Sequence, residues 1–220
     1  MDRVHGIARP QFPAFLLNSA VDELFKKEFD VYRATKQPHP IMQEYGIDAV
    51  PYQHVELEKW RHNFTGVRTM HAATNFELFG AVDDVWINPE GELYVVDYKS
   101  TSKDEKVSLD DKWKEGYKRQ LEIYQWLLRQ KGFNVSDKGF FVYANGRKDR
   151  DAFDAKLEFD VTLLEYVGNA DWIEGTLLKI KKILDSESIP EAHPDCEHCE
   201  YAQKRRKFDS DDMMNLTIEM

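Results

Sequence analysis

One stretch constrains the fold of this chain more than any other: GAVDDVWINPEGELYVVDYKST, which runs from Gly80 to Thr101. Its two halves are rich in Val, Ile, Leu, Tyr and Trp, residues that are typical of buried strands. Between the halves, residues 88–91 read Asn-Pro-Glu-Gly, which places Asn, Pro and Gly where a type I turn favours them. The stretch therefore predicts a β-hairpin, although acidic residues and a lysine interrupt its strands.

The turn type also predicts which residues face one another across the hairpin. Gly91 can adopt the left-handed conformation that closes a three-residue loop with a G1 bulge. Counting back from that loop pairs Val85 with Val95, and pairs Asp83 with Asp97 on the same face. Opposite Cβ atoms lie roughly 4.5–5.5 Å apart, where like charges destabilise a sheet. A divalent cation held by both carboxylates would compensate that repulsion.

The same register gives positions to two further charged residues. Lys99 lies two residues beyond Asp97, on the same face and at the open end of the pair, whereas Asp84 points to the other face and is expected to be solvated or paired elsewhere. Two alternatives remain open. A two-residue loop would put Asp83 on the face opposite Asp97, and an ordinary ion pair between Asp97 and Lys99 on an edge strand would need no metal.

The segments around the hairpin predict an α/β domain. Hydrophobic periodicity predicts helices over residues 18–33, 54–64, 111–132 and 162–186. Further strands are predicted within residues 67–79, over residues 138–146 ending in an Asn-Gly turn, and over residues 155–161. This order of helices and strands indicates a mixed sheet.

Composition narrows the class of protein. The 220 residues are 42% hydrophobic, which is enough for a packed core. No apolar run is long enough to span a bilayer and the N-terminal residues lack a signal-peptide core, so we expect a cytoplasmic protein without a membrane partner. The formal net charge of −10 argues against broad attraction to nucleic acid, but not against a local basic patch or a cation-filled acidic site.

The order of motifs resembles the PD-(D/E)XK nuclease superfamily, and most closely its RecB/Cas4-like branch. Gly-x-x-Asp is followed by a strand that ends in Asp-x-Lys and then by a helix with Gln-x-x-x-Tyr. The resemblance covers roughly residues 18–145. It implies a restriction-endonuclease-like core with a central mixed β-sheet flanked by helices, formed by residues 1–206 as a single domain with a polar tail over residues 207–220. The matching residues are Gly80, Asp83, Asp97, Lys99, Gln120 and Tyr124.

The resemblance implies a deoxyribonuclease that hydrolyses phosphodiester bonds with Mg²⁺ or Mn²⁺. In such an enzyme, Asp83, Asp97 and the backbone carbonyl of Tyr98 would hold the metal. Lys99 would orient the attacking water or stabilise charge on the phosphate.

Related nucleases carry a further histidine ligand on the first helix, and the comparable position here is Asp22. Its carboxylate also suits Mg²⁺. Glu28 and His71 are competing candidates, and a solvated helix surface is the alternative for Asp22.

Gln120 and Tyr124 lie one turn apart on the predicted helix over residues 111–132. With Trp113, Tyr117 and Leu127 they form one stripe, which would be a plain core stripe if it had no other role. A glutamine inside an apolar stripe needs a hydrogen-bond partner when it is buried. The resemblance implies that Gln120 and Tyr124 contact the active site and the DNA strand.

Cys196 and Cys199 form a CxxC pair, which is half of a four-ligand zinc or iron–sulfur site. Cas4-type nucleases hold a [4Fe–4S] cluster with one cysteine before the first helix and three near the C-terminus. No cysteine precedes Cys196, so we expect no intact iron–sulfur cluster. A local zinc site with His193 and His198, a missing N-terminal piece, a degenerate cluster and free thiols remain as interpretations.

Lysines and arginines cluster over residues 112–120, 147–150 and 203–208, which are candidates for a path along the DNA backbone or are ordinary solvated faces. By resemblance, we expect an exonuclease on single-stranded or end-bearing DNA in repair, recombination or defence, working alone or with other DNA-processing proteins. The alternative is a catalytically inactive DNA-binding or assembly subunit of a larger complex.

Overall fold

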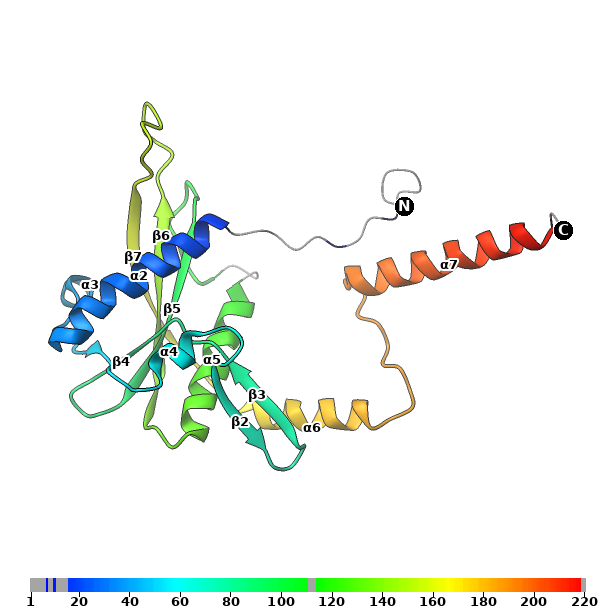
Figure 1. Cartoon of the computed structure of the whole chain (residues 1–220), viewed down its shortest axis with the longest axis horizontal. Coiled ribbons are helices and arrows are strands. Elements are labelled where there is room, and N and C mark those ends of the chain that lie inside the picture. The colour runs from blue at the N-terminus through cyan, green and yellow to red at the C-terminus, as the bar shows by residue number, and fades with distance from the viewer. Residues whose placement is uncertain (1–6, 8–9, 11–15, 111–113, 219–220) are drawn as a thin grey trace. The chain divides into compact units, whose positions relative to one another are not determined.

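The computed structural model describes residues 7, 10, 16–110 and 114–218, with the side chains of residues 16 and 210–218 excepted. The chain divides into two compact units, one of residues 15–181 and one of residues 1–14 with 182–220. The larger unit contains all the described strands (Figure 1). No described helix is long and apolar enough to cross a membrane.

A five-stranded mixed sheet forms the centre of the larger unit, in the order β1-β4-β5-β6-β7. The β5–β6 pair is parallel and the other pairs are antiparallel. Helix α5 (Glu115–Gln130) makes the crossover that a parallel pair requires. The strands are β1 (Val50–Pro51), β4 (Asp84–Ile87), β5 (Leu93–Thr101), β6 (Val135–Gly146) and β7 (Phe159–Val167).

The two faces of this sheet carry separate hydrophobic clusters, because side chains alternate along each strand. On one face, helix α2 (Leu16–Thr35) packs Phe25 and Phe29 against Val96. On the other, α5 packs Leu121 and Leu127 among core residues that include Val95. The carboxylates of the hairpin must therefore lie either under α2 or under α5. Figure 1 shows both helices against the sheet.

Shorter elements complete the two units. The segment over residues 67–79 contains two strands rather than one, β2 (Val67–His71) and β3 (Phe76–Gly80), which pair with each other. The predicted short helix over residues 54–64 is confirmed as α4 (Leu57–Arg61). The remaining helices are α3 (Pro40–Glu44), α6 (Trp172–Leu184) and α7 (Glu197–Ile218).

The predicted helix over residues 162–186 is wrong in its first part, because residues 162–167 belong to β7. Strand β6 is longer than predicted and leaves an edge that would expose unpaired backbone groups. Strand β7 covers that edge, and this pairing outweighs the helical spacing of Leu163, Leu164 and Val167. The predicted Asn-Gly turn is wrong for the same reason, since Asn145 and Gly146 pair with β7.

Candidate active site

The hairpin of β4 and β5 has the predicted register. Gly91 has a φ of 79° and donates a backbone hydrogen bond to Asn88, so the loop has three residues. Val85 pairs with Val95, and regular pairing ends at Asp84 with Val96. This confirms the predicted loop and excludes the two-residue alternative, which would have moved Asp83 away from Asp97.

Asp83 lies at the point where the hairpin ladder stops. The Tyr98 backbone N–H, which regular pairing would direct to β4, donates to Asp83 Oδ2 at 2.9 Å. The Val82 N–H turns away and donates to the Trp60 carbonyl at 3.1 Å. The opening between the two strands therefore gives the Asp83 carboxyl room beside β5.

The structure brings the Asp83 and Asp97 carboxyls together, with Asp97 buried and the Asp83 side chain 22% exposed at its edge. Burial raises the pKa of Asp83 to about 7, and the Asp97 carboxylate adds to that shift. Burial also raises the pKa of Asp97, which the Lys99 ammonium opposes. Asp97 is only 1% exposed. Without a bound cation, a proton on this pair is therefore favoured near neutral pH.

Lys99 connects the acid pair to α5. Its ammonium forms an ion pair with Asp97 Oδ2 and donates to Gln120 Oε1 at 3.4 Å. Gln120 Nε2 in turn donates to the Tyr124 hydroxyl at 2.7 Å, and the Lys99 ammonium lies 4.7 Å from the centre of the Tyr117 ring. Gln120 thus has the polar partners that its place in an apolar stripe requires. Trp113, the first residue of the predicted stripe, lies outside the described residues.

Gly80 has a steric reason to be glycine. A Cβ atom at this position would lie 2.5 Å from Tyr124 Cε1, too close for any side chain unless the ring moved. The end of β3 therefore packs directly against the Tyr124 ring. This contact links the first motif residue to the last and fixes where α5 meets the hairpin.

Helix α2 adds a third acid and a second lysine. Lys26 Nζ lies 2.7 Å from Asp22 Oδ2 and 3.7 Å from Asp83 Oδ1. Sequence reasoning singled out Asp22 and missed Lys26, although the spacing of four residues on a helix was a usable signal. The competing candidates lie elsewhere, because Glu28 pairs with His39 and His71 pairs with Glu174.

Asp22, Asp83 and Lys99 line a cavity of about 670 Å³. The wall of the cavity is polar and mostly uncharged. One lysine and two aspartates line it, together with hydroxyl, amide and aromatic side chains. The lining residues are Asn18, Ser19, Val21, Asp22, Asn63, Asp83, Tyr98, Lys99, Ser100, Thr101, Tyr117 and Gln120.

Two buried carboxylate oxygens of the site make no hydrogen bond to the described residues, Asp22 Oδ1 and Asp97 Oδ2, although the latter has its ion pair with Lys99. Within the described part of the chain, no three His, Cys, Asp or Glu side chains are arranged as a metal site. A cation would therefore depend on two carboxylates with backbone and water oxygens, which is a coordination that Mg²⁺ accepts. The donor set fits a hard divalent cation.

Asp84 corrects one expectation. It lies on the face opposite Asp83, as the register predicts, but it is fully buried rather than solvated. Arg33 and Arg61 both reach Asp84 Oδ1, at 2.5 and 3.0 Å, and the Tyr98 hydroxyl donates to Oδ2 at 2.7 Å. The alternative expectation, that Asp84 pairs with residues outside the acid pair, is confirmed.

The Asp84 network also holds the backbone of Asp83 in place. Arg61 Nε donates to the Asp83 carbonyl at 3.1 Å, while Arg61 and Arg33 both pair with Asp30 on α2. The network thus connects α2, α4 and the hairpin. Sequence reasoning missed both arginines, because their partner is distant along the chain.

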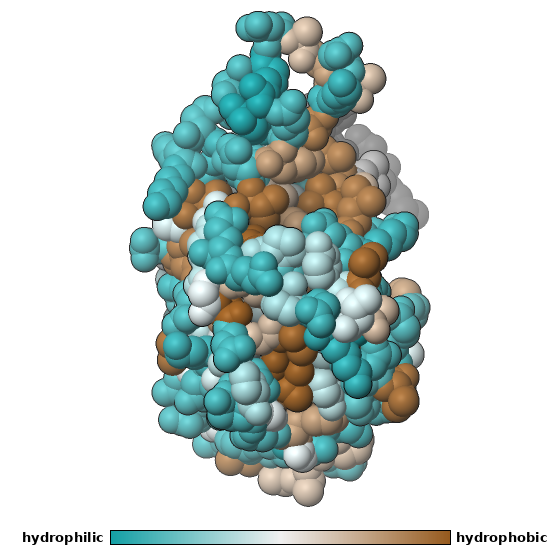
Figure 2. All heavy atoms as spheres, turned by 90° about the vertical axis from the view of Figure 1, so that its left-hand side faces the viewer, coloured by the Kyte–Doolittle hydropathy of each residue, from teal (hydrophilic) through white to brown (hydrophobic). Residues whose placement is uncertain are grey.

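The basic clusters are largely neutralised by neighbouring acids. Figure 2 shows hydrophilic side chains gathered at the top, over the loop between β6 and β7 that carries one cluster. Its arginines and lysine lie close to acids, so the loop offers little net positive charge. Ion pairs between described residues of the three clusters include Arg147–Asp149, Arg147–Asp160, Lys148–Asp104, Arg150–Glu158, Lys118–Glu115, Lys204–Glu200 and Arg205–Asp209.

The cysteines belong to the smaller unit. Cys196 lies just before α7 and Cys199 in its first turn, and both are free thiols. Hydrogen bonds with Cys199 lower the pKa of Cys196, and the same contact raises that of Cys199. His193 accepts a hydrogen bond from the Asp195 backbone.

Comparison with known proteins bears on the superfamily that the order of motifs resembles. The sequence model of the PD-(D/E)XK nuclease superfamily matches residues 6–203. No curated protein matches the chain at a significant level. A solved structure described as the crystal structure of SSO0001 is 20% identical over 84% of this chain and 82% of its own, but the TM-score of 0.34 is too low to support an argument. The match over most of the sequence shows that the chain belongs to the PD-(D/E)XK nuclease superfamily.

Proposed function

We propose that the protein is a metal-dependent deoxyribonuclease of the RecB/Cas4-like branch, which acts as an exonuclease on single-stranded or end-bearing DNA in repair, recombination or defence. The observation that carries the proposal is the approach of Asp83, Asp97 and Lys99 beside one open cavity. Asp83 beside β5, with Asp97 and Lys99 on β5, provides for cation binding and for charge stabilisation at a phosphate. Membership of the superfamily supports the nuclease class.

In this proposal, Asp83, Asp97 and the Tyr98 carbonyl hold Mg²⁺ or Mn²⁺, with Asp22 as the candidate for a further ligand. When bound, such a cation polarises the scissile phosphate and makes water a better nucleophile. Hairpin pairing ends before Tyr98, so its backbone faces the opening beside Asp83 rather than a paired strand. As ligands of such a cation, Asp83 and Asp97 would both be ionised, so the pair would hold no proton in the bound form.

The remaining residues orient the reaction. Lys99 places its ammonium next to Asp97, where it would stabilise charge on the phosphate oxygens or orient the attacking water. Gln120 holds Lys99 through its carbonyl oxygen and Tyr124 through its amide, so the helix fixes the direction of the lysine. Tyr117 offers an exposed ring at the cavity, on which a base of an unpaired strand can stack.

The test is cleavage of labelled single-stranded and duplex DNA in Mg²⁺ or Mn²⁺ by the wild type and by Asp97→Asn. We expect Asp97→Asn to lose activity at least a hundredfold, whereas Asp48→Asn, at an exposed position outside the site, keeps it. Equal cleavage by Asp97→Asn and the wild type would show that this site does not catalyse the cleavage. If the wild type binds DNA but does not cleave it, the result would favour the alternative function, a catalytically inactive DNA-binding subunit.

A second measurement distinguishes the mode of attack. Circular single-stranded DNA has no end, so we expect it to resist cleavage while the linear form of the same sequence is degraded. Rapid cleavage of the circle would make the enzyme an endonuclease and would correct this part of the proposal.

A further inference from the structure

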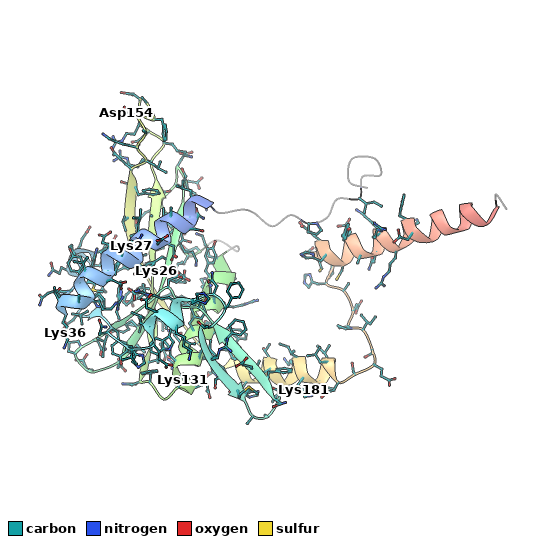
Figure 3. All side chains as sticks on the ribbon, viewed as in Figure 1. Lys26, Lys27, Lys36, Lys131, Asp154 and Lys181 are labelled. Atoms are coloured by element: carbon teal, nitrogen blue, oxygen red, sulfur yellow. The ribbon has the colours of Figure 1, made fainter. Side chains whose placement is uncertain are left out.

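Lys26 occupies an unusual place for a lysine on a helix surface. Its side chain is only 21% exposed, and its ammonium lies between the carboxylates of Asp22 and Asp83. The side chain of the next residue, Lys27, is 66% exposed and pairs with Glu23. Figure 3 labels both lysines on α2. The contrast shows that Lys26 belongs to the acid site and Lys27 to the helix surface.

The position of Lys26 matches what a second cation does in two-metal phosphodiesterases. In those sites two cations about 3.5–4 Å apart share carboxylate ligands. Here Asp83 directs Oδ2 to the Tyr98 N–H, while Oδ1 lies 3.7 Å from the Lys26 ammonium. The same ammonium lies 2.7 Å from Asp22 Oδ2. A single positive charge thus already joins two carboxylates on the α2 side of the site.

The net charge of the site also favours a single divalent cation. Asp22, Asp83 and Asp97 carry three negative charges when ionised, and Lys26 and Lys99 carry two positive ones, which leaves one negative charge. One divalent cation makes the site positive by one unit, which attracts a phosphodiester. A second divalent cation on the α2 side would meet the Lys26 ammonium at close range and be repelled.

We propose that Lys26 supplies a fixed positive charge in place of a second divalent cation, so that the site binds a single divalent cation. This inference rests on the proposed metal-dependent activity. Lys26 is a positioning residue, because it acts through Asp22 and Asp83 rather than on the phosphate. In the wild type, Asp22 Oδ2 binds the lysine, which leaves Oδ1 for the single cation; without the lysine, Oδ2 would become available to a second cation.

The test measures Mn²⁺ binding rather than cleavage. The full chain and its variants are titrated with Mn²⁺ by calorimetry, and the bound ions are examined by electron paramagnetic resonance. We expect one Mn²⁺ per chain with an uncoupled signal for the wild type and for the matched control Lys27→Met. Lys26→Met is expected to bind two ions with the coupled signal of neighbouring Mn²⁺, and Lys26→Arg is expected to restore single binding.

The outcomes separate this inference from the proposed function. Two coupled ions in the wild type, or a single ion in a folded Lys26→Met, would overturn the role of Lys26 and leave the nuclease proposal standing. No Mn²⁺ at the site of the wild type, with binding unchanged in Asp97→Asn, would overturn the metal centre itself. If Lys26→Met does not fold, the wild-type stoichiometry can still overturn the inference, because two coupled ions are incompatible with it.

Discussion

Asp83 and Asp84 follow one another in the sequence, yet β-strand alternation sends them to opposite faces of the hairpin. Asp83 joins Asp97 beside the cavity, with its charge incompletely compensated. Asp84 is fully buried, and Arg33, Arg61 and the Tyr98 hydroxyl surround its two oxygens. Asp83 is therefore the acid that we propose as a cation ligand, whereas Asp84 holds the strand in place. Substitution of each by its amide should have opposite effects on stability.

The first prediction concerns pH. The folded pKa of Asp83 is about 7, above its value of about 3.9 in the unfolded chain, so the folded state holds a proton that the unfolded state has released. In EDTA, the free energy of unfolding should therefore fall by on the order of 2 kcal/mol from pH 5.5 to pH 8. Urea unfolding at the two pH values measures this difference.

Asp83→Asn is the control for that prediction, because it cannot ionise. It should unfold with a much smaller difference between the two pH values and be more stable than the wild type at pH 8. Acids whose pKa is lowered, such as Asp30 and Asp149, stay ionised throughout this range and do not confuse the result. An equally large fall in Asp83→Asn would show that other groups cause it.

The second prediction concerns Asp84→Asn. Loss of the carboxylate leaves the guanidinium groups of Arg33 and Arg61 buried with too little negative charge. Breaking a buried ion pair in this way costs about 3–5 kcal/mol. Urea unfolding at pH 7 should show a loss of this size, while Asp48→Asn at an exposed position should change little. A stability equal to that of the wild type would mean that the network relaxes without cost.

At the scale of elements, the site depends on how α5 meets the strands. Tyr124 packs where Gly80 ends β3, and Gln120 reaches Lys99 on β5. These two contacts come from the same face of one helix, one turn apart. A displacement of α5 would therefore disturb the lysine and the aromatic contact together.

Gly80→Ala tests this contact. The new Cβ would meet the Tyr124 ring, so we expect a loss of about 1–3 kcal/mol in stability and a reduced rate of DNA cleavage. Gly116→Ala is the matched control on α5, because nothing lies within 4 Å of its Cβ position. The control should be neutral or more stable by about 0.5–1 kcal/mol. Wild-type stability and activity in Gly80→Ala would show that Tyr124 moves freely.

The sequence predicted the parts of the fold that depend on local chemistry. The turn of residues 88–91 determined the hairpin register, and a regular stripe predicted most of α5. The strand predicted over residues 155–161 covers only the start of β7, and the rest of β7 is predicted as helix, because β7 forms on an edge supplied by β6. Nor could the sequence reveal the burial of Asp84, whose partners Arg33 and Arg61 lie 51 and 23 residues away.

At the scale of the whole molecule, the larger unit contains the sheet, both hydrophobic clusters and every residue proposed for catalysis. The smaller unit contributes α7 and the CxxC pair. Because each unit has its own internal contacts, the stability of the larger one should not depend on residues beyond α6.

A shortened chain that ends after Ser188 tests this independence. It retains α6 completely, so we expect the same midpoint of thermal unfolding as for the full chain. Circular dichroism at one protein concentration gives the comparison. A clear fall in the midpoint would show that the C-terminal segment stabilises the larger unit.

The close approach of the two carboxylates on one hairpin has a consequence for the order of folding. Asp83 and Asp97 lie at one end of a single hairpin, which can form before the parallel β5–β6 pair, because that pair needs the α5 crossover. The two acids therefore meet while water still surrounds them, and their repulsion grows as the hydrophobic clusters close over the site. We expect this last step of folding to depend on a proton or a cation at the pair, so the cation proposed for catalysis would also act as a folding partner.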